Sequence, residues 1–436
     1  MEWWWALAFI FGGLVLFMAS GLPVAFAFLL INIVGIFFFW GGEAGLGQLI
    51  LSIYAAVTNF ALLPVPMFFL MGEIMFQSGV ATSVINALDK LLGRLPGRLS
   101  LLAVGAGTLL SVLTGVPMAS VAIMGTVMLP EMERRGYHKS MSIGPILGSG
   151  GLAMLIPPSA LAVLLAALAG ISVSKLLIGG IVPGLLLAVL FAIYILVRCR
   201  LQPSMAPTYD VRPIPFREKM KTFVRYILPL GLVVFLVIGV MLLGICTPTE
   251  AAATGTVGCF ILAGFNKKLN WNVIRKSFMN TARLTVMVFM IVAGSTAFSQ
   301  MLAFSQASKG LVELVARSSL PPTLLIIGMQ FVLFILGCFM DAFSIMMITI
   351  PIYFPIITGL GLNPLWFGIL MLLNIEVAPI TPPFGLELFV MKGVAPSTTT
   401  MSDIYRAAIP FVLIDVLVLL AMVFFPQISL WLPGLM

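Results

Sequence analysis

Apolar stretches alternate along the chain with short polar or basic segments. Five stretches are close to the roughly 20 residues that a helix needs to span a membrane, and they predict spans at 177–197, 226–244, 250–266, 284–306 and 404–425. Two longer stretches, 143–169 and 366–391, predict spans that are interrupted at a Pro-Pro pair. The pattern is typical of an all-α polytopic membrane protein in which some helices are broken.

Basic residues gather in three polar segments. The largest is 198–225, and shorter clusters cover 90–98 and 134–139. Because Lys and Arg are enriched in cytoplasmic loops, we place all three segments in the cytoplasm. The largest segment then acts as a cytoplasmic linker between a first half, 1–197, and a second half, 226–436.

Two apolar segments predict re-entrant hairpins. The segment 100–130 lies between two cytoplasmic clusters, and two full spans would need about 40 residues. It therefore enters and leaves on the same side, with its tip at 113–118. The segment 322–355 lies between stretches poor in positive charge and predicts a hairpin that enters from outside, with its tip at 337–342. The prediction is ten spans of about 20 residues each, two hairpins, and both termini in the periplasm.

A single offset of 225 residues aligns the two halves. It carries Pro157-Pro158 to Pro382-Pro383, and it also relates Pro23 to Pro248, Leu95-Pro96 to Leu320-Pro321, and Pro130 to Pro355. Chance matches among many Pro and Gly residues are the alternative. Because the halves start on opposite sides, they predict an inverted-topology repeat, which is typical of secondary transporters. Broken helices in such folds place substrate and ions near the membrane midplane.

Composition excludes several classes of function. Of the residues, 61% are hydrophobic and 9% are charged, so a water-soluble fold is excluded. The one histidine, His138, lies in a basic cluster, and the four cysteines form no CxxC pair. No catalytic residues are therefore predicted, and we expect neither an enzyme nor a zinc site. The net charge of +8 is explained by cytoplasmic loops rather than by binding of nucleic acid.

Several motifs resemble one transporter family. They are Leu129–Met132 with Arg135–Tyr137, Gly151–Ser159, Thr247–Ala253, Gly337–Asp341, and Thr381–Gly385 with Leu388–Val390. In order and spacing they resemble the large membrane subunit, the DctM family, of tripartite ATP-independent periplasmic (TRAP) transporters. The resemblance implies an elevator-type, Na⁺-coupled importer of organic acids in the bacterial inner membrane. It also implies two partners, a small DctQ-like membrane subunit and a soluble DctP-like periplasmic binding protein.

The sequence departs from the family at two positions. The first hairpin tip reads Thr114-Gly115-Val116 instead of a Ser-Gly-Ser-like sequence. Glu387 stands where the family often has Asn after the Pro-Pro motif. Backbone ligands would survive both changes, whereas side-chain contacts to a substrate would differ.

The hairpin tips and the Pro-Pro breaks are the predicted Na⁺ sites, because a proline within a helix leaves a carbonyl without its usual N–H partner. The predicted ligands are Thr114, Gly115, Ser149, Gly151, Pro157 and Ser159 at the first site and Gly337, Asp341, Thr381 and Gly385 at the second, with Glu376 beside it. Asp341, Glu376 and Glu387 are the predicted substrate-binding residues, since ionisable groups inside spans are costly.

Each of these residues also has a structural interpretation. Asp341 could cap a hairpin helix, and Glu376 and Glu387 could form structural pairs. Glu73 and Asp415 are better explained as pairs within a scaffold or as contacts to the small subunit. The glycines could simply allow helices to pack closely.

Other arrangements and functions compete with this interpretation. The segments 47–62 and 271–283 predict interfacial helices, which could brace the scaffold or merely connect spans. The main rival is a stand-alone carrier similar to divalent-anion:sodium symporters. An ABC permease is suggested only by Glu250-Ala251-Ala252, which our topology places outside, and an intramembrane enzyme lacks the residues it would need.

Overall fold

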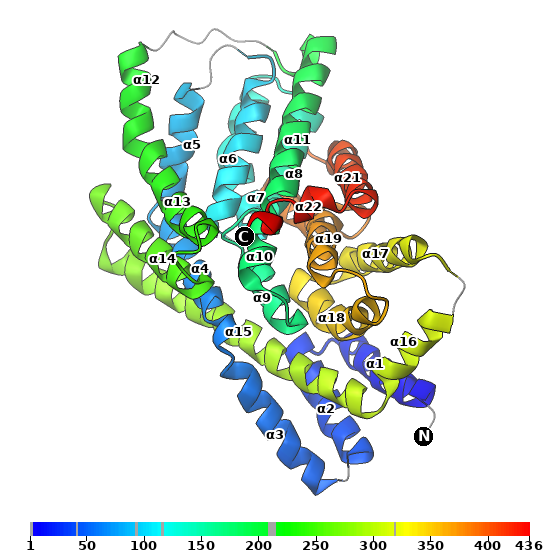
Figure 1. The fold of residues 1–436 in the computed structure, drawn as a ribbon. Coiled ribbons are helices and arrows are strands. Elements are labelled where there is room, and N and C mark those ends of the chain that lie inside the picture. Colours follow the sequence, from blue (N-terminus) through cyan, green and yellow to red (C-terminus); the bar gives the residue numbers. More distant parts are fainter. Residues whose placement is uncertain (1–2, 41, 92–94, 115–116, 208–214, 318–319) are drawn as a thin grey trace.

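The computed structural model describes the chain except residues 1–2, 41, 92–94, 115–116, 208–214 and 318–319, and it describes only the backbone of 110–114 and 119. Throughout the described residues the regular structure is helical (Figure 1). Seven helices of this part are long and apolar enough to cross a membrane. This result confirms the predicted class of an all-α polytopic membrane protein.

The first half begins with helices that precede the first hairpin. These are α1 (Trp3–Ala19), α2 (Val24–Phe39), α3 (Glu43–Val57), η1 (Phe60–Leu62), α4 (Pro64–Gln77) and α5 (Val80–Leu91). The hairpin pair and the helices after it are α6 (Arg98–Thr114), α7 (Pro117–Arg134), α8 (Lys139–Gly151), α9 (Ala160–Ala169), α10 (Val173–Gly179) and α11 (Ile181–Leu201).

Short helices connect the first half to the second. They are η2 (Pro203–Met205), α12 (Phe216–Thr222) and a π-helical turn, η3 (Phe223–Ile227). The second half contains α13 (Leu228–Leu242), α14 (Pro248–Phe265), α15 (Trp271–Phe304), α16 (Ala307–Arg317), α17 (Pro322–Phe339), α18 (Ala342–Gly359), α19 (Pro364–Val377), η4 (Ala378–Ile380), α20 (Leu386–Val394), α21 (Met401–Phe424), α22 (Gln427–Leu430) and η5 (Pro433–Leu435).

Helix pairs stand at both predicted hairpins. Helices α6 and α7 pack together at the first, and α17 and α18, separated only by Met340 and Asp341, form the second. Both predicted breaks are present as well. The chain leaves helical geometry at 152–159 between α8 and α9, and again at 381–385 between η4 and α20. Each break contains a cis Pro-Pro bond.

One helix differs from the sequence prediction. The expected interfacial helix at 271–283 and the span at 284–306 form a single helix, α15, of 34 residues. Figure 1 shows it crossing the molecule from α14 to α16. The corresponding segment of the first half is divided into α3, η1 and α4. Pro64 and Pro66 interrupt that segment, and the offset replaces them by Phe289 and Ile291, which can continue a helix.

The two halves interlock through their hairpins. Helix α7 of the first hairpin packs against α20, and α18 of the second hairpin packs against α9. The offset of 225 relates these two contacts, because it carries α7 to α18 and α9 to α20 within a residue. The same relation holds for the contact of α2 with α15 and that of α4 with α14. The opposite orientation of the halves in the membrane stays a prediction.

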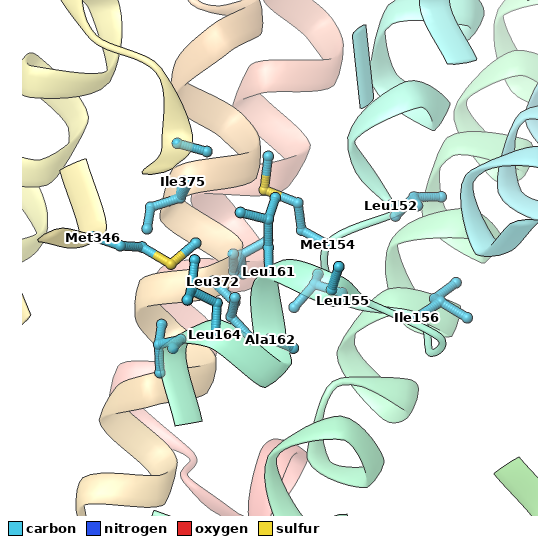
Figure 2. Packing of buried hydrophobic residues seen from close by; sticks show 14 of the residues in the cluster. Leu152, Met154, Leu155, Ile156, Leu161, Ala162, Leu164, Met346, Leu372 and Ile375 are labelled. Carbon is cyan, nitrogen blue, oxygen red and sulfur yellow. The ribbon is translucent and has the colours of Figure 1, made fainter. Parts of the chain in front are cut away.

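The broken helices lie at the centre of the molecule. Every residue of α8 from Met141 to Gly151 is buried, as is every residue of α19 from Trp366 to Val377. Around the first break, Met154 and Leu155 pack near Leu161 of α9, Met346 of α18 and Leu372 of α19 (Figure 2). At the first break, residues 152–159 are all buried, so this non-helical backbone is enclosed by protein, as membrane proteins require. At the second break, Thr381 and Gly385 are buried, whereas Pro383 and Phe384 are exposed.

An ion pair joins the beginnings of two central helices. Lys139 Nζ, at the start of α8, lies 2.8 Å from Asp403 Oδ2 in the first turn of α21 and also donates to the carbonyl of Thr398. We expect Lys139→Met to lower the melting temperature of the purified protein, with a coupling to Asp403→Asn of about 0.5–1 kcal/mol in a double-mutant cycle. Lys175→Met, at an exposed lysine on α10, is the control. Strictly additive effects of the two changes would show that the ion pair contributes nothing.

Candidate functional site

Five helices begin at the wall of one cavity of about 500 Å³. The first turns of α2, α7, α9, α18 and α20 line it, so both hairpins and both broken helices meet there. Helices α2 and α15 close the other side. The lining residues are Pro117 and Met118 of α7, Leu161 of α9, Asp341 to Ser344 at α18, Glu387 of α20, Met154 and Pro379 at the breaks, Pro23 to Ala25 at α2, and Leu284, Met287 and Ile291 of α15.

Helix N-termini suit this cavity to negatively charged groups. The first N–H groups of a helix have no partner within it, and the macrodipole places about half a positive charge there. Some of these N–H groups are already capped. Ser159 Oγ accepts the N–H of Ala162 at the start of α9, whereas Gly385, which precedes α20, supplies no side-chain cap.

Asp341 is both a helix cap and part of the cavity wall. Its Oδ1 accepts the N–H groups of Phe343 and Ser344 at 3.0 and 3.2 Å. The hydroxyl of Ser344 donates to the other carboxylate oxygen. The side chain lines the cavity and is only partly buried. The capping role and the site role, which competed in the sequence analysis, are therefore geometrically compatible.

Glu387 lines the cavity, and Glu376 does not. Each residue is 1% exposed. Among the described residues, Glu387 Oε2 and both carboxylate oxygens of Glu376 have no hydrogen-bond partner. Asp415 and Glu387 are the carboxyl groups whose electrostatic interaction reaches Glu376.

Two glycines at the end of α8 contact these two carboxyl groups. A Cβ atom at Gly151 would collide with Cγ of Glu376, and a Cβ atom at Gly150 would lie 3.6 Å from Glu387 Oε2. The end of α8, just before the first break, is thus the point where the first half touches both acidic residues of the second broken helix.

Among the residues predicted for the first Na⁺ site, those that the structure describes do not line the cavity. Gly115 and the side chain of Thr114 lie outside the described residues. The hydroxyl of Ser149 donates to the carbonyl of Pro145 at 2.7 Å. Pro157 and Ser159 are buried within the break. The lining residue of this segment is Met154.

Three residues predicted for the second Na⁺ site surround the second break. Gly337, near the end of α17, faces Ala378, since a Cβ atom there would collide with the Ala378 side chain. Thr381 Oγ1 donates to the carbonyl of Val377 at 2.9 Å, and Gly385 packs against the carbonyl of Pro379. Within the part of the chain that is described, no three His, Cys, Asp or Glu side chains gather as a metal site. A cation here would depend mainly on backbone carbonyls and hydroxyls, with Asp341 as the one carboxylate in the predicted set.

The wall that α2 and α15 contribute was not predicted from the sequence. Its six residues are apolar and lie in apolar helices, so no residue type distinguishes them. The methionines Met118 and Met154 were missed for the same reason. Pro23 carried the only signal, as one of the positions aligned by the 225-residue offset.

A second cavity, of about 550 Å³, lies between α3 and α15 on one side and α9 and α18 on the other. Its lining includes Asn59, Leu62, Ser295, Thr296 and Ser299. The offset of 225 carries Asn59 and Leu62 to Leu284 and Met287, which line the first cavity. The segment between α3 and α4 lines the second cavity with the positions that correspond, through the repeat, to those with which α15 lines the first.

Comparisons with known proteins agree with the resemblance found in the sequence. The profile of the family described as "Tripartite ATP-independent periplasmic transporter, DctM component" matches residues 11–428. The C4-dicarboxylate TRAP transporter large permease protein DctM of Pseudomonas aeruginosa is 33% identical and covers 89% of each chain. The ectoine TRAP transporter large permease protein TeaC of Halomonas elongata is 30% identical over 95% of this chain and 96% of its own. These matches confirm the resemblance.

Among solved structures, the YdaH transporter of Alcanivorax borkumensis is similar to this chain, with a TM-score of 0.63. The alignment covers 90% of this chain and 89% of that one at 15% sequence identity. At this identity the comparison establishes a similar fold and nothing about substrate or mechanism.

The contact between Gly337 and Ala378 can be tested by substitution. Gly337→Ala places a methyl group where the second hairpin meets the second break, and overpacking of this kind costs about 1–3 kcal/mol. Gly328→Ala, on the same helix, is the control because no atom lies within 4 Å of the added carbon. We expect a lower melting temperature for the first variant only. Equal melting temperatures would show that the hairpin and the break are not in contact.

Proposed function

The chain belongs to the DctM family of TRAP transporters, and we propose that it is the substrate-translocating subunit of a Na⁺-coupled importer of small organic acids. The substrate would carry a carboxylate or sulfonate group and would be delivered by a periplasmic binding protein. One observation carries the proposal. Five helices from both halves begin at the wall of a single cavity that also contains two carboxyl groups.

The acidic group of the substrate would bind at the helix N-termini. The first turns of α2, α7 and α9 hold no acidic residue, so their partial positive charge remains available for an anion. Asp341 and Glu387 would contact the polar groups of the substrate directly. Glu376 lies behind the cavity wall, so we propose that it acts through its neighbours and not by direct contact.

Sodium would bind where the helices are broken, as a coupling ion that travels with the substrate. The proposed ligands are Thr114, Gly115, Ser149, Gly151, Pro157 and Ser159 at the first break and Gly337, Asp341, Thr381 and Gly385 at the second. The unpartnered carboxylate oxygens of Glu376, next to Gly151, support a positive charge in this region. A buried carboxylate without a donor is costly unless a cation or proton accompanies it.

Transport would follow an elevator mechanism. The hairpins and broken helices would move as one body against a frame that includes α2, α3, α4 and α15. The two cavities support this proposal. Asn59 and Leu62 of the frame line one cavity, and the residues related to them by the repeat, Leu284 and Met287, line the other. Movement of the body along α15 would transfer the substrate from one cavity to the other.

The protein would lie in the bacterial inner membrane with both termini in the periplasm. Its proposed partners are a small DctQ-like membrane subunit and a DctP-like binding protein, as in other TRAP transporters. A stand-alone carrier similar to divalent-anion:sodium symporters is the alternative, and dependence on the partners separates the two.

The requirement for partners is testable in proteoliposomes. We expect the complete transporter, with the small subunit and the binding protein, to take up substrate when a Na⁺ gradient is applied. This chain alone should transport little, because the binding protein delivers the substrate. Vigorous Na⁺-driven uptake by the chain alone would favour the stand-alone carrier.

Asp341→Asn tests the carboxylate at the second hairpin. Asn caps helices as well as Asp does, so the change removes the charge and keeps α18 intact. We expect uptake by the complete transporter to fall at least about tenfold, equivalent to about 1.4 kcal/mol. Higher external Na⁺ should partly rescue the variant if the carboxylate binds Na⁺, and higher substrate should do so if it binds substrate.

Glu313→Gln, at an exposed acidic residue on α16, is the control and should transport normally. Normal uptake by Asp341→Asn at low Na⁺ and low substrate would show that Asp341 serves only as a helix cap.

A further inference from the structure

Glu376 and Asp415 form a pair of carboxyl groups inside the protein. Glu376 lies in the last turn of α19 and Asp415 lies in α21. The two helices pack together, and the electrostatic interaction of Asp415 reaches Glu376. Each residue is 1% exposed, and neither lines one of the two cavities described above. The pair therefore belongs neither to these cavity walls nor to a surface that the small subunit would contact.

These carboxyl groups lack hydrogen-bond donors. Among the described residues, both oxygens of Glu376 and the Oδ1 atom of Asp415 have no partner. A buried ionised carboxyl group without donors is costly, and two such groups side by side also repel each other. The pair therefore needs a companion that supplies positive charge and a donor.

The ends of both broken helices add negative potential around Glu376. Gly151, the last residue of α8, lies against its side chain, because a Cβ atom there would lie 3.1 Å from Glu376 Oε1. Glu376 itself lies in the last turn of α19. Since a helix C-terminus carries about half a negative charge, both helices disfavour an ionised carboxyl group at this point.

The basic groups of the neighbouring helices lie away from the pair. Besides Asp415, Glu387 is the group whose interaction reaches Glu376, and it has the same sign. Lys139 begins α8, about 18 Å along the helix from the end that meets the pair, and the exposed Arg406 lies about 14 Å from Asp415 along α21. The other titratable groups on helices packed against α19 and α21 are Lys175, Tyr194, Arg198, Cys199, Arg200, Cys338, Tyr353, Lys392, Asp403 and Tyr405.

We propose that Glu376 and Asp415 share one proton, which makes the pair a proton-binding site separate from the Na⁺ sites. One carboxyl group donates its O–H to the other in a charge-assisted hydrogen bond. The pair then carries one negative charge instead of two, as other close carboxyl pairs do. This proton allows the ends of α8 and α19 to meet beside an acidic residue. The inference does not rest on the proposed function.

A proton suits this position better than a sodium ion does. A sodium ion needs several oxygen ligands and a route from water. Asp415 lies in the interior of the continuous helix α21, whose nearby carbonyls bond within the helix, and neither carboxyl group lines a described cavity. A proton needs only one donor and one acceptor oxygen, and the pair supplies both.

The first test is thermal melting of the purified full-length chain at neutral and at alkaline pH. Loss of the shared proton leaves two adjacent carboxylates, so the melting temperature of the wild type should fall as the pH rises. In Glu376→Gln an amide N–H replaces the O–H as the donor to Asp415. This variant should therefore lose less than the wild type over the same pH range, by about 5 °C or more. Asp415→Asn should behave in the same way.

Glu73→Gln is the matched control for both variants. Glu73 is an acidic residue of α4 whose carboxylate accepts N–H groups from Gln77 and Asn280, so it has donors of its own. This variant should lose as much as the wild type. Ionisation of Lys, Tyr and Cys at alkaline pH is common to all of these proteins and cancels in the comparison.

Infrared difference spectra give a readout that does not depend on stability. The C=O stretch of a protonated carboxyl group is separate from the bands of carboxylates and amides. The spectrum of the wild type minus that of Glu376→Gln should contain this band at neutral pH and lose it at alkaline pH. Asp415→Asn should give the same difference from the other side of the pair, and Glu73→Gln should not.

Stabilisation by Na⁺ distinguishes a proton from a metal ion. If the pair held Na⁺, Glu376→Gln would raise the Na⁺ concentration for half-maximal thermal stabilisation about tenfold or more. We expect this concentration to stay within about twofold of the wild-type value, which corresponds to less than about 0.5 kcal/mol.

Three results would overturn the inference. They are an equal loss of melting temperature at alkaline pH in the wild type and both pair variants, no band of a protonated carboxyl group in either difference spectrum, and a tenfold higher Na⁺ requirement in Glu376→Gln. Failure of the proposed function has a different signature, since it would appear as a lack of Na⁺-driven uptake by the complete transporter and would leave these three measurements unchanged.

Discussion

The need to satisfy backbone polar groups away from water governs this structure. A helix that stops inside a membrane leaves N–H and C=O groups without partners, and lipid supplies none. Both broken helices therefore lie at the centre of the protein, where α8 and α19 are buried along most of their length. Protein encloses the whole of the first break and part of the second, and residues at both breaks line one cavity.

The interlocking of the halves follows from that constraint. Each break needs cover on several sides, and part of the cover comes from the hairpin of the opposite half, through α7 on α20 and α18 on α9. Close approach requires small residues at the contacts, which explains why Gly151 of the first half meets Glu376 of the second. Each half therefore covers part of the broken helix of the other half, in addition to the cover that comes from its own helices.

Sequence patterns predicted the elements well where prolines or clusters of basic residues mark their ends. The Pro-Pro pairs located both breaks, and the basic clusters located the first hairpin, because these signals depend on nearby residues alone. The continuity of α15 was missed, since Trp271 and the basic residues after it resemble an interfacial segment whether or not the helix continues. The cavity could not be predicted in full. Leu284 and Met287 look like any lipid-facing residues, and only the tertiary fold separates Glu387, in the wall, from Glu376, behind it.

The unbroken helix α15 has a geometric consequence. It lines the first cavity around Met287 and the second around Thr296. A helix rises about 1.5 Å per residue, so these wall positions lie about 14 Å apart along its axis. Because a continuous helix changes length very little, it fixes that separation. A moving site that served both cavities would therefore travel a distance set by the spacing of these residues on α15. A break in this helix, of the kind found between α3 and α4, would leave that distance unfixed.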